Sequence, residues 1–155
     1  MENTSRTRLA IFLLIAYGLT ALMALPMFVG FREGLSLYAF PNAQMFYPAA
    51  GVAAGLLVTG DRKRLPMSFF ILLLAVAALL AVLAVLSVTV TIPDLSIAGQ
   101  TIPVFQMVCQ YVIIGGSVLG WVFLLAEGKQ RRAAAGLTRR NWGAAIAVTA
   151  LFVAL

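Results

Sequence analysis

Long stretches without a charged side chain constrain this chain more than any other feature. Residues 9–31 and 104–126 are each 23 residues long and contain no Asp, Glu, Lys or Arg, and residues 65–93 are uncharged as well. As an α-helix, 23 residues extend about 34 Å, which exceeds the roughly 30 Å hydrocarbon core of a bilayer. The sequence therefore predicts helices that cross a membrane.

The composition leads to the same conclusion. Hydrophobic residues make up 63% of the 155 residues and charged residues make up 10%, against roughly 45–50% and about 25% in soluble domains. A soluble fold of this size buries only about 70% of its unfolded surface, so much apolar side chain would face water. These values exclude a soluble enzyme, a disordered protein and a disulfide-stapled secreted module.

We expect an all-α fold, an integral membrane helical bundle that forms a single transmembrane domain over residues 1–155. It has four transmembrane helices plus a short or truncated fifth apolar helix, at about 9–31, 43–60, 66–92, 104–126 and 142–155. Gly, Pro and Asn indicate a loop over 32–44, and polar–apolar alternation favours a short hairpin about Ala98 and Gly99. A signal peptide competes for the first segment, but its length and the lack of a clear A-x-A site favour a retained helix.

The last apolar segment, residues 142–155, is short for a membrane span. It fits an interfacial helix, the shortened last span of a small protein, or the opening of a fifth helix whose remainder is missing. We expect the third, because a basic and aromatic entry precedes the segment and the apolar pattern is still running at Leu155.

The basic residues predict how the helices are oriented. If the N-terminus is cytoplasmic, ten of the eleven Lys and Arg residues fall on the same side, and only Arg32 lies on the other. This is the distribution that the positive-inside rule describes. We therefore expect a multi-pass protein of the cell inner (plasma) membrane, whose partner is the lipid bilayer. The net charge of +6 then reflects orientation, and no nucleic-acid partner is expected.

Chemically reactive residues are scarce. The expected spans contain no ionisable carboxylate or base, and the chain has no His and a single Cys, Cys109. Metal sites and nucleophilic catalysis in proteins are built mainly from those residue types. We therefore predict no catalytic, cofactor-binding or metal-binding residue in this chain.

Small and amide side chains give the remaining pattern, which concerns helix packing. Two Gly-x-x-x-Gly pairs, which permit close helix contact, lie in the second and fourth expected helices, and two glutamines lie one turn apart in the fourth. We expect packing between helices of one bundle, with homodimerisation as the alternative. The candidate packing residues are Gly51, Gly55, Gly116, Gly120, Gln106 and Gln110.

Three segments together resemble the N-terminal half of the CPBP family of intramembrane metalloproteases, which includes type II CAAX prenyl endopeptidases and bacteriocin-processing proteins. They are residues 8–20 (RLAIFLLIAYGLT), 45–51 (MFYPAAG) and 136–142 (GLTRRNW). The resemblance implies a family activity of proteolysis on membrane or prenylated substrates, with a divalent metal such as zinc. The family's paired-glutamate and histidine motifs are absent, so none of its catalytic residues carries over to this chain.

Three functions from different classes follow. The leading hypothesis is a non-catalytic, N-terminal membrane portion of a CPBP-type protease, inactive alone, with other transmembrane helices or a missing C-terminal half as partners. The competing hypothesis is a complete small four-helix membrane protein with a structural, immunity or accessory role. A third is half of a transporter that dimerises, which would need a polar path through Gln106 and Gln110.

Overall fold

In the computed structural model, which describes residues 2–61, 63–97 and 100–134, the chain begins with one long helical segment. This segment comprises α1 (Glu2–Leu13), a π-helical turn η1 (Leu14–Gly18) and α2 (Leu19–Arg32). It starts seven residues before the expected 9–31, because the polar residues ahead of Leu9 include neither Gly nor Pro. The Thr7 hydroxyl donates to the Asn3 carbonyl at 2.9 Å. The Thr20 hydroxyl of α2 donates at 2.6 Å to the carbonyl of Ala16, which lies in the π-helical turn.

The second apolar segment differs most from expectation. In place of one helix at 43–60, the structure has α3 (Ala39–Gln44) and α4 (Tyr47–Thr59). Pro48 explains the division, because it has no N–H to donate to the Gln44 carbonyl and its ring would clash there. The expected loop over 32–44 is correspondingly wrong in its second half: Pro41 lies in the first turn of α3, where no donor is needed.

The next two long helices agree closely with the sequence. Helix α5 (Met67–Thr89) ends three residues before the expected boundary of 66–92, and α6 (Val104–Ala126) has the expected bounds. Between them, β1 (Leu95–Ile97) pairs antiparallel with β2 (Gln100–Ile102), which confirms the hairpin. A short helix, α7 (Lys129–Ala134), follows α6, and the expected helix at 142–155 lies outside the described residues.

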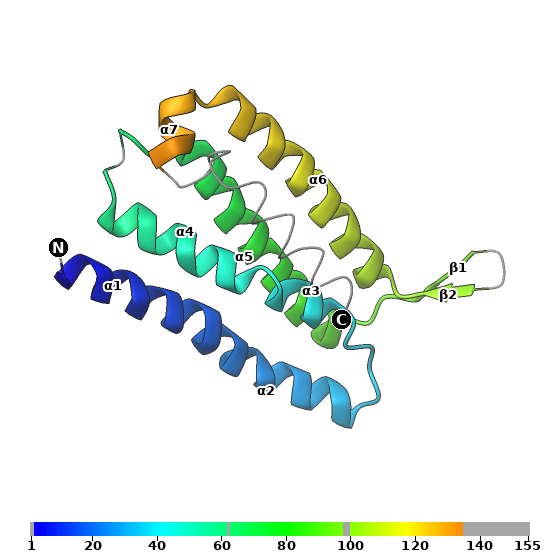
Figure 1. Cartoon of the computed structure of the whole chain (residues 1–155). Helices are drawn as coiled ribbons and strands as arrows, with labels where there is room; N and C mark the ends of the chain where they lie inside the picture. The colour runs from blue at the N-terminus through cyan, green and yellow to red at the C-terminus, as the bar shows by residue number, and fades with distance from the viewer. Residues whose placement is uncertain (1, 62, 98–99, 135–155) are drawn as a thin grey trace, which may run out of the picture.

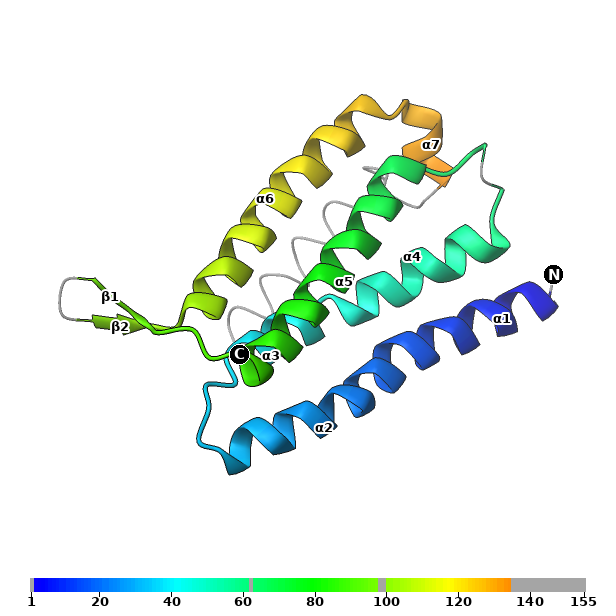
Figure 2. The same cartoon turned by 180° about the vertical axis from the view of Figure 1, so that it is seen from behind.

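Helix α5 lies at the centre of the arrangement. It packs against α2, α3, α4 and α6, while α1 packs against α4, and α3 and α4 lie end to end along it (Figures 1 and 2). The main core forms where α3 and the start of α4 meet α5 and α6, and Phe40, Leu80 and Cys109 are fully buried there. The short helix α3 is thus part of the core rather than a surface connection.

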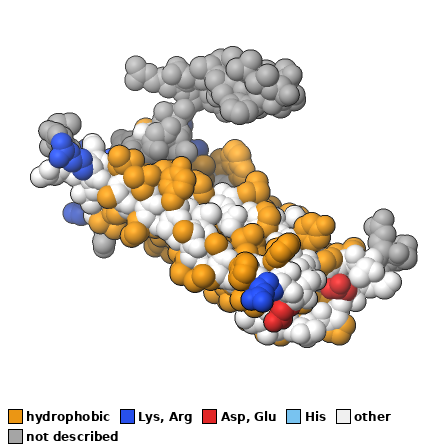
Figure 3. Space-filling model, turned by 90° about the horizontal axis from the view of Figure 1, so that it is seen from below, with side chains coloured by type: hydrophobic (Ala, Val, Ile, Leu, Met, Phe, Trp, Pro, Cys, Tyr) orange, Lys and Arg blue, Asp and Glu red, His pale blue; other side chains and the backbone are white. Residues whose placement is uncertain are grey.

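Three helices in the described part of the chain are long and apolar enough to cross a membrane: residues 3–32, 67–89 and 104–126. Charged side chains gather at the two ends, with hydrophobic surface between them (Figure 3). The N-terminus, the α4–α5 loop and α7 lie at one end, which we call the basic end, and the hairpin lies at the other (Figure 1). The fold is therefore that of a helical membrane protein.

Candidate functional site

The first glycine pair brings two helix backbones together. Gly51 and Gly55 of α4 are buried against α1. A methyl group added to Gly51 would lie 3.1 Å from the Phe12 carbonyl oxygen and 3.2 Å from its Cα atom, and one added to Gly55 would lie 3.4 Å from the Arg8 carbonyl oxygen. A methyl group at Gly51 would therefore require the Phe12 main chain to move back by a few tenths of an ångström. Beside this contact, the Arg8 Nε donates to the Thr59 hydroxyl oxygen at 2.6 Å.

The second glycine pair receives side chains instead. A methyl group added to Gly116 of α6 would lie 2.8 Å from Cγ2 of Val76 on α5, and one added to Gly120 would lie 3.5 Å from Cε2 of Phe69. The neighbouring Gly115 faces open space. The structure therefore places both pairs at contacts between helices of the same chain.

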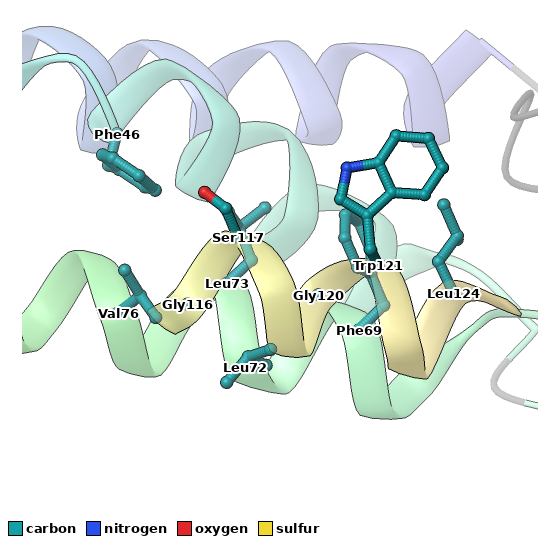
Figure 4. Close-up of a pocket in the computed structure, with 10 residues that line it drawn as sticks. All are labelled: Phe46, Phe69, Leu72, Leu73, Val76, Gly116, Ser117, Gly120, Trp121 and Leu124. Atoms are coloured by element: carbon teal, nitrogen blue, oxygen red, sulfur yellow. The ribbon is translucent and has the colours of Figure 1, made fainter. Parts of the chain in front are cut away.

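A groove opens beside the α5–α6 contact and is our candidate functional site. It has a volume of about 320 Å³ and runs between α5 and α6 to the α3–α4 connection. Ser117 and Trp121 project from α6 on the side where Phe46 lies (Figure 4). Its lining residues are Phe46, Phe69, Leu72, Leu73, Val76, Gly116, Ser117, Gly120, Trp121 and Leu124.

One edge of this groove continues into an exposed face of α6. Gln110, Ile114, Ser117 and Trp121 are spaced three or four residues apart and are all exposed, so they form a single stripe, which we call the outer stripe. Gln110 lies about 9 Å along the axis of α6 from Val104, the first residue of that helix. It is therefore inside the part of α6 that the hydrocarbon core of a bilayer would cover. The outer stripe therefore combines apolar surface with amide and hydroxyl groups.

The two predicted glutamines are not brought together in one site. Gln106 is half-buried and lines a different cavity, of about 300 Å³, at the hairpin end with Ser36, Ser87 and Asp94. Gln110 is exposed on the outer stripe, and no side-chain hydrogen bond of either glutamine occurs among the described residues.

The groove is suited to binding apolar surface rather than to reacting with it. Among the described residues that line it, Ser117 supplies the only side-chain hydroxyl. Across the described residues, no three His, Cys, Asp or Glu side chains gather to form a possible metal site. The described residues therefore offer no set of ligands for the divalent metal that the CPBP resemblance implies.

Sequence patterns identified the glycines of this site but missed its large side chains. Phe69 and Trp121 belong to no motif, and Phe46 belongs only to the CPBP-like segment 45–51. The shared position of the three depends on how α5, α6 and the α3–α4 connection meet. The available signal was the Gly116 and Gly120 spacing, which marks a helix face that admits a neighbour's bulky residues.

Comparison with known proteins finds no family model, no curated protein and no solved structure that matches this chain.

Proposed function

We propose that this chain is a multi-pass inner-membrane protein with four crossings and a cytoplasmic N-terminus. The three long apolar helices support this, together with α3 and α4, which jointly extend along α5. The positive-inside rule supports the orientation, because Lys63, Arg64, Lys129, Arg131 and Arg132 lie at the same end as the N-terminus.

We further propose that the chain acts as a non-catalytic membrane portion that packs against further transmembrane helices, as the N-terminal half of a CPBP-type protease would. The observation that carries this proposal is the outer stripe of α6. Leaving the Gln110 amide without a partner in hydrocarbon is unfavourable, whereas a neighbouring helix can supply a hydrogen bond and fill the groove beside Trp121. Trp121 is 66% exposed and Ile114 is 58% exposed, so the stripe is open to such a helix.

The quoted CPBP-like segments occupy two different places in the fold. Residues 8–20 run from α1 through η1 into α2, and residues 45–51 form the α3–α4 connection and the first turn of α4. The third segment, 136–142, lies outside the described residues. The family relationship is proposed on the sequence of these segments.

The genomic DNA that follows codon 155 tests the proposed family role. A reading frame that continues into a Glu-Glu-x-x-x-Arg motif and later histidine motifs would support it, and a stop codon directly after Leu155 would refute it. If the frame continues, the two halves can be co-expressed as separate chains. Trp121→Ala should then reduce their co-purification, whereas Tyr111→Ala, at an equally exposed aromatic about 100° round α6 from Gln110, should not.

Alkaline phosphatase fusions test the four crossings, because this reporter is active only outside the cytoplasm. We expect active fusions after Ser36 and Ser96, and inactive fusions after Lys63 and Lys129. Equal activity after Ser36 and Lys63 would show that α3 and α4 do not cross.

A complete small four-helix protein with an accessory, immunity or structural role is the second candidate. The open groove of about 320 Å³ favours it as well, because a separate partner protein could fill the same space. Native mass spectrometry in detergent distinguishes the two candidates: a complex with a separately encoded protein, lost in the Trp121→Ala variant, supports the accessory role, and a lone monomer contradicts it.

A further inference from the structure

A third cavity lies at the basic end of the molecule. It has a volume of about 430 Å³ and is lined by Lys63, Arg64, Gln130 and Arg131. The first two residues belong to the α4–α5 loop and the last two to α7, so segments far apart in sequence converge on one space. All four lining side chains can donate hydrogen bonds.

Each of the two arginines of this cavity forms an ion pair with a carboxylate. Oε2 of Glu127, whose side chain is only 8% exposed, accepts from Nη1 of Arg131 at 3.0 Å. Oδ2 of Asp61 lies 3.3 Å from Nε of Arg64. Each guanidinium has five N–H donors, so both arginines keep donors free for a ligand after these contacts are made.

The α4–α5 loop is shaped by the same aspartate. Oδ1 of Asp61 accepts from the Lys63 backbone N–H at 3.1 Å, and the Asp61 carbonyl accepts from the Arg64 backbone N–H at 2.9 Å. This local turn presents the two basic side chains in succession. Lys63 forms no ion pair with any described residue.

The position of the cavity indicates what it could bind. Helix α5 begins at Met67 and α6 ends at Ala126, so the cavity lies just beyond the ends of two apolar helices. Phospholipid phosphates lie at this level of a bilayer. Arginine donates to phosphate oxygens through paired N–H groups, and lysine contributes a compact positive charge.

We propose that Lys63, Arg64, Gln130 and Arg131 form a binding site for a phosphate group. The phosphate belongs either to an anionic phospholipid headgroup or to a soluble phosphate compound. This site is independent of the outer stripe and of the CPBP resemblance.

The test uses the full chain purified in a neutral detergent. Its thermal unfolding is measured at constant ionic strength with short-chain phosphatidylglycerol, with phosphatidylcholine of the same chain length, and with inorganic phosphate. Phosphatidylglycerol should raise the unfolding temperature more than phosphatidylcholine does. A response to phosphatidylglycerol alone assigns the site to a lipid headgroup, and a response to inorganic phosphate assigns it to the phosphate group itself. Phosphatidylcholine carries the same phosphodiester, but its choline cation cancels the negative charge that the basic side chains would bind. Equal responses to both lipids, with none to inorganic phosphate, would therefore refute the proposal.

Substitutions locate the response in the cavity. Lys63→Gln removes a lining charge without breaking an ion pair and should weaken binding about tenfold. Lys129→Gln removes the same charge from α7 outside the cavity and should leave binding unchanged. Arg131→Gln should weaken binding more, but it leaves Glu127 buried without its partner and can unfold the chain. Equal effects of Lys63→Gln and Lys129→Gln would show a diffuse charge effect and overturn the site.

Discussion

The α1–α4 and α5–α6 contacts share the same glycine spacing, but the atoms that meet the glycines differ. In the first, Gly51 lies against main-chain atoms of Phe12; in the second, Gly116 lies against the side chain of Val76. A substitution cannot make the main chain smaller, whereas a side chain can be replaced by a smaller one or can change rotamer. The first contact therefore fixes how closely two helices approach, and the second fixes which side chain fits. This difference predicts which substitutions can be compensated.

The largest effect is expected for Gly51→Leu. The new side chain has no space at the Phe12 main chain, so α1 must move away from α4, at a cost of about 3 kcal/mol or more in the free energy of unfolding. Gly115→Leu is the matched control, because Gly115 faces open space. Denaturant unfolding in detergent measures both variants. Equal midpoints for the two would show that the α1–α4 approach is not limited by backbone contact.

Gly116→Ala tests the second contact with a smaller change. The added methyl group would lie 2.8 Å from Cγ2 of Val76, which should cost about 1–3 kcal/mol. Combining it with Val76→Ala should recover much of this loss in a double-mutant cycle. Gly51→Ala should show no such recovery with Phe12→Ala, because its closest clashes are with main-chain atoms. Equal recovery of the unfolding free energy in both cycles would show that the two glycine contacts do not differ in this way.

Thr59→Val examines the polar edge of the α1–α4 contact. The Thr59 hydroxyl accepts from Arg8 and donates to the Gly55 carbonyl at 2.7 Å, so its loss should cost about 1 kcal/mol. Thr89→Val is the control, since that hydroxyl donates to the Val85 carbonyl within its own helix and to no other described residue. If Thr89→Val lowers the free energy of unfolding as much as Thr59→Val does, the hydrogen bond between α1 and α4 makes no separate contribution to stability.

The smallest effect is expected for Gly55→Ala. Its methyl group would make an ordinary contact of 3.4 Å with the Arg8 carbonyl oxygen, and alanine favours the helix over glycine by about 1 kcal/mol. The unfolding free energy should therefore stay within about 1 kcal/mol of the parent value. A loss as large as that of Gly51→Ala would show that both glycines are equally constrained.

The sequence predicts helix bounds well where proline, glycine or charged residues directly flank an apolar run. Pro103 precedes α6, and Glu127 and Gly128 follow it, so its bounds could be predicted to the residue. The prediction failed at the α3–α4 connection, because the run of apolar residues hides the effect of Pro48 on the preceding carbonyl. The glycine spacing was visible, but its partners were not. Which backbone or side chain meets a glycine depends on the pairing of helices distant in sequence.

The π-helical turn at Leu14–Gly18 has a consequence for the first helix as a whole. One added residue in a turn rotates all later side chains by about 100° around the axis. Helix α1 accordingly faces α4, while Gly30 of α2 lies against Val88 of α5 and Met23 is buried in the main core. A helical wheel drawn through both halves superimposes two rotational phases and blurs each face. Removing one residue from this turn would let it close as an ordinary α-helix and leave Met23 and Gly30 facing the same neighbours, whereas winding all five residues as α-helix would rotate both away from them.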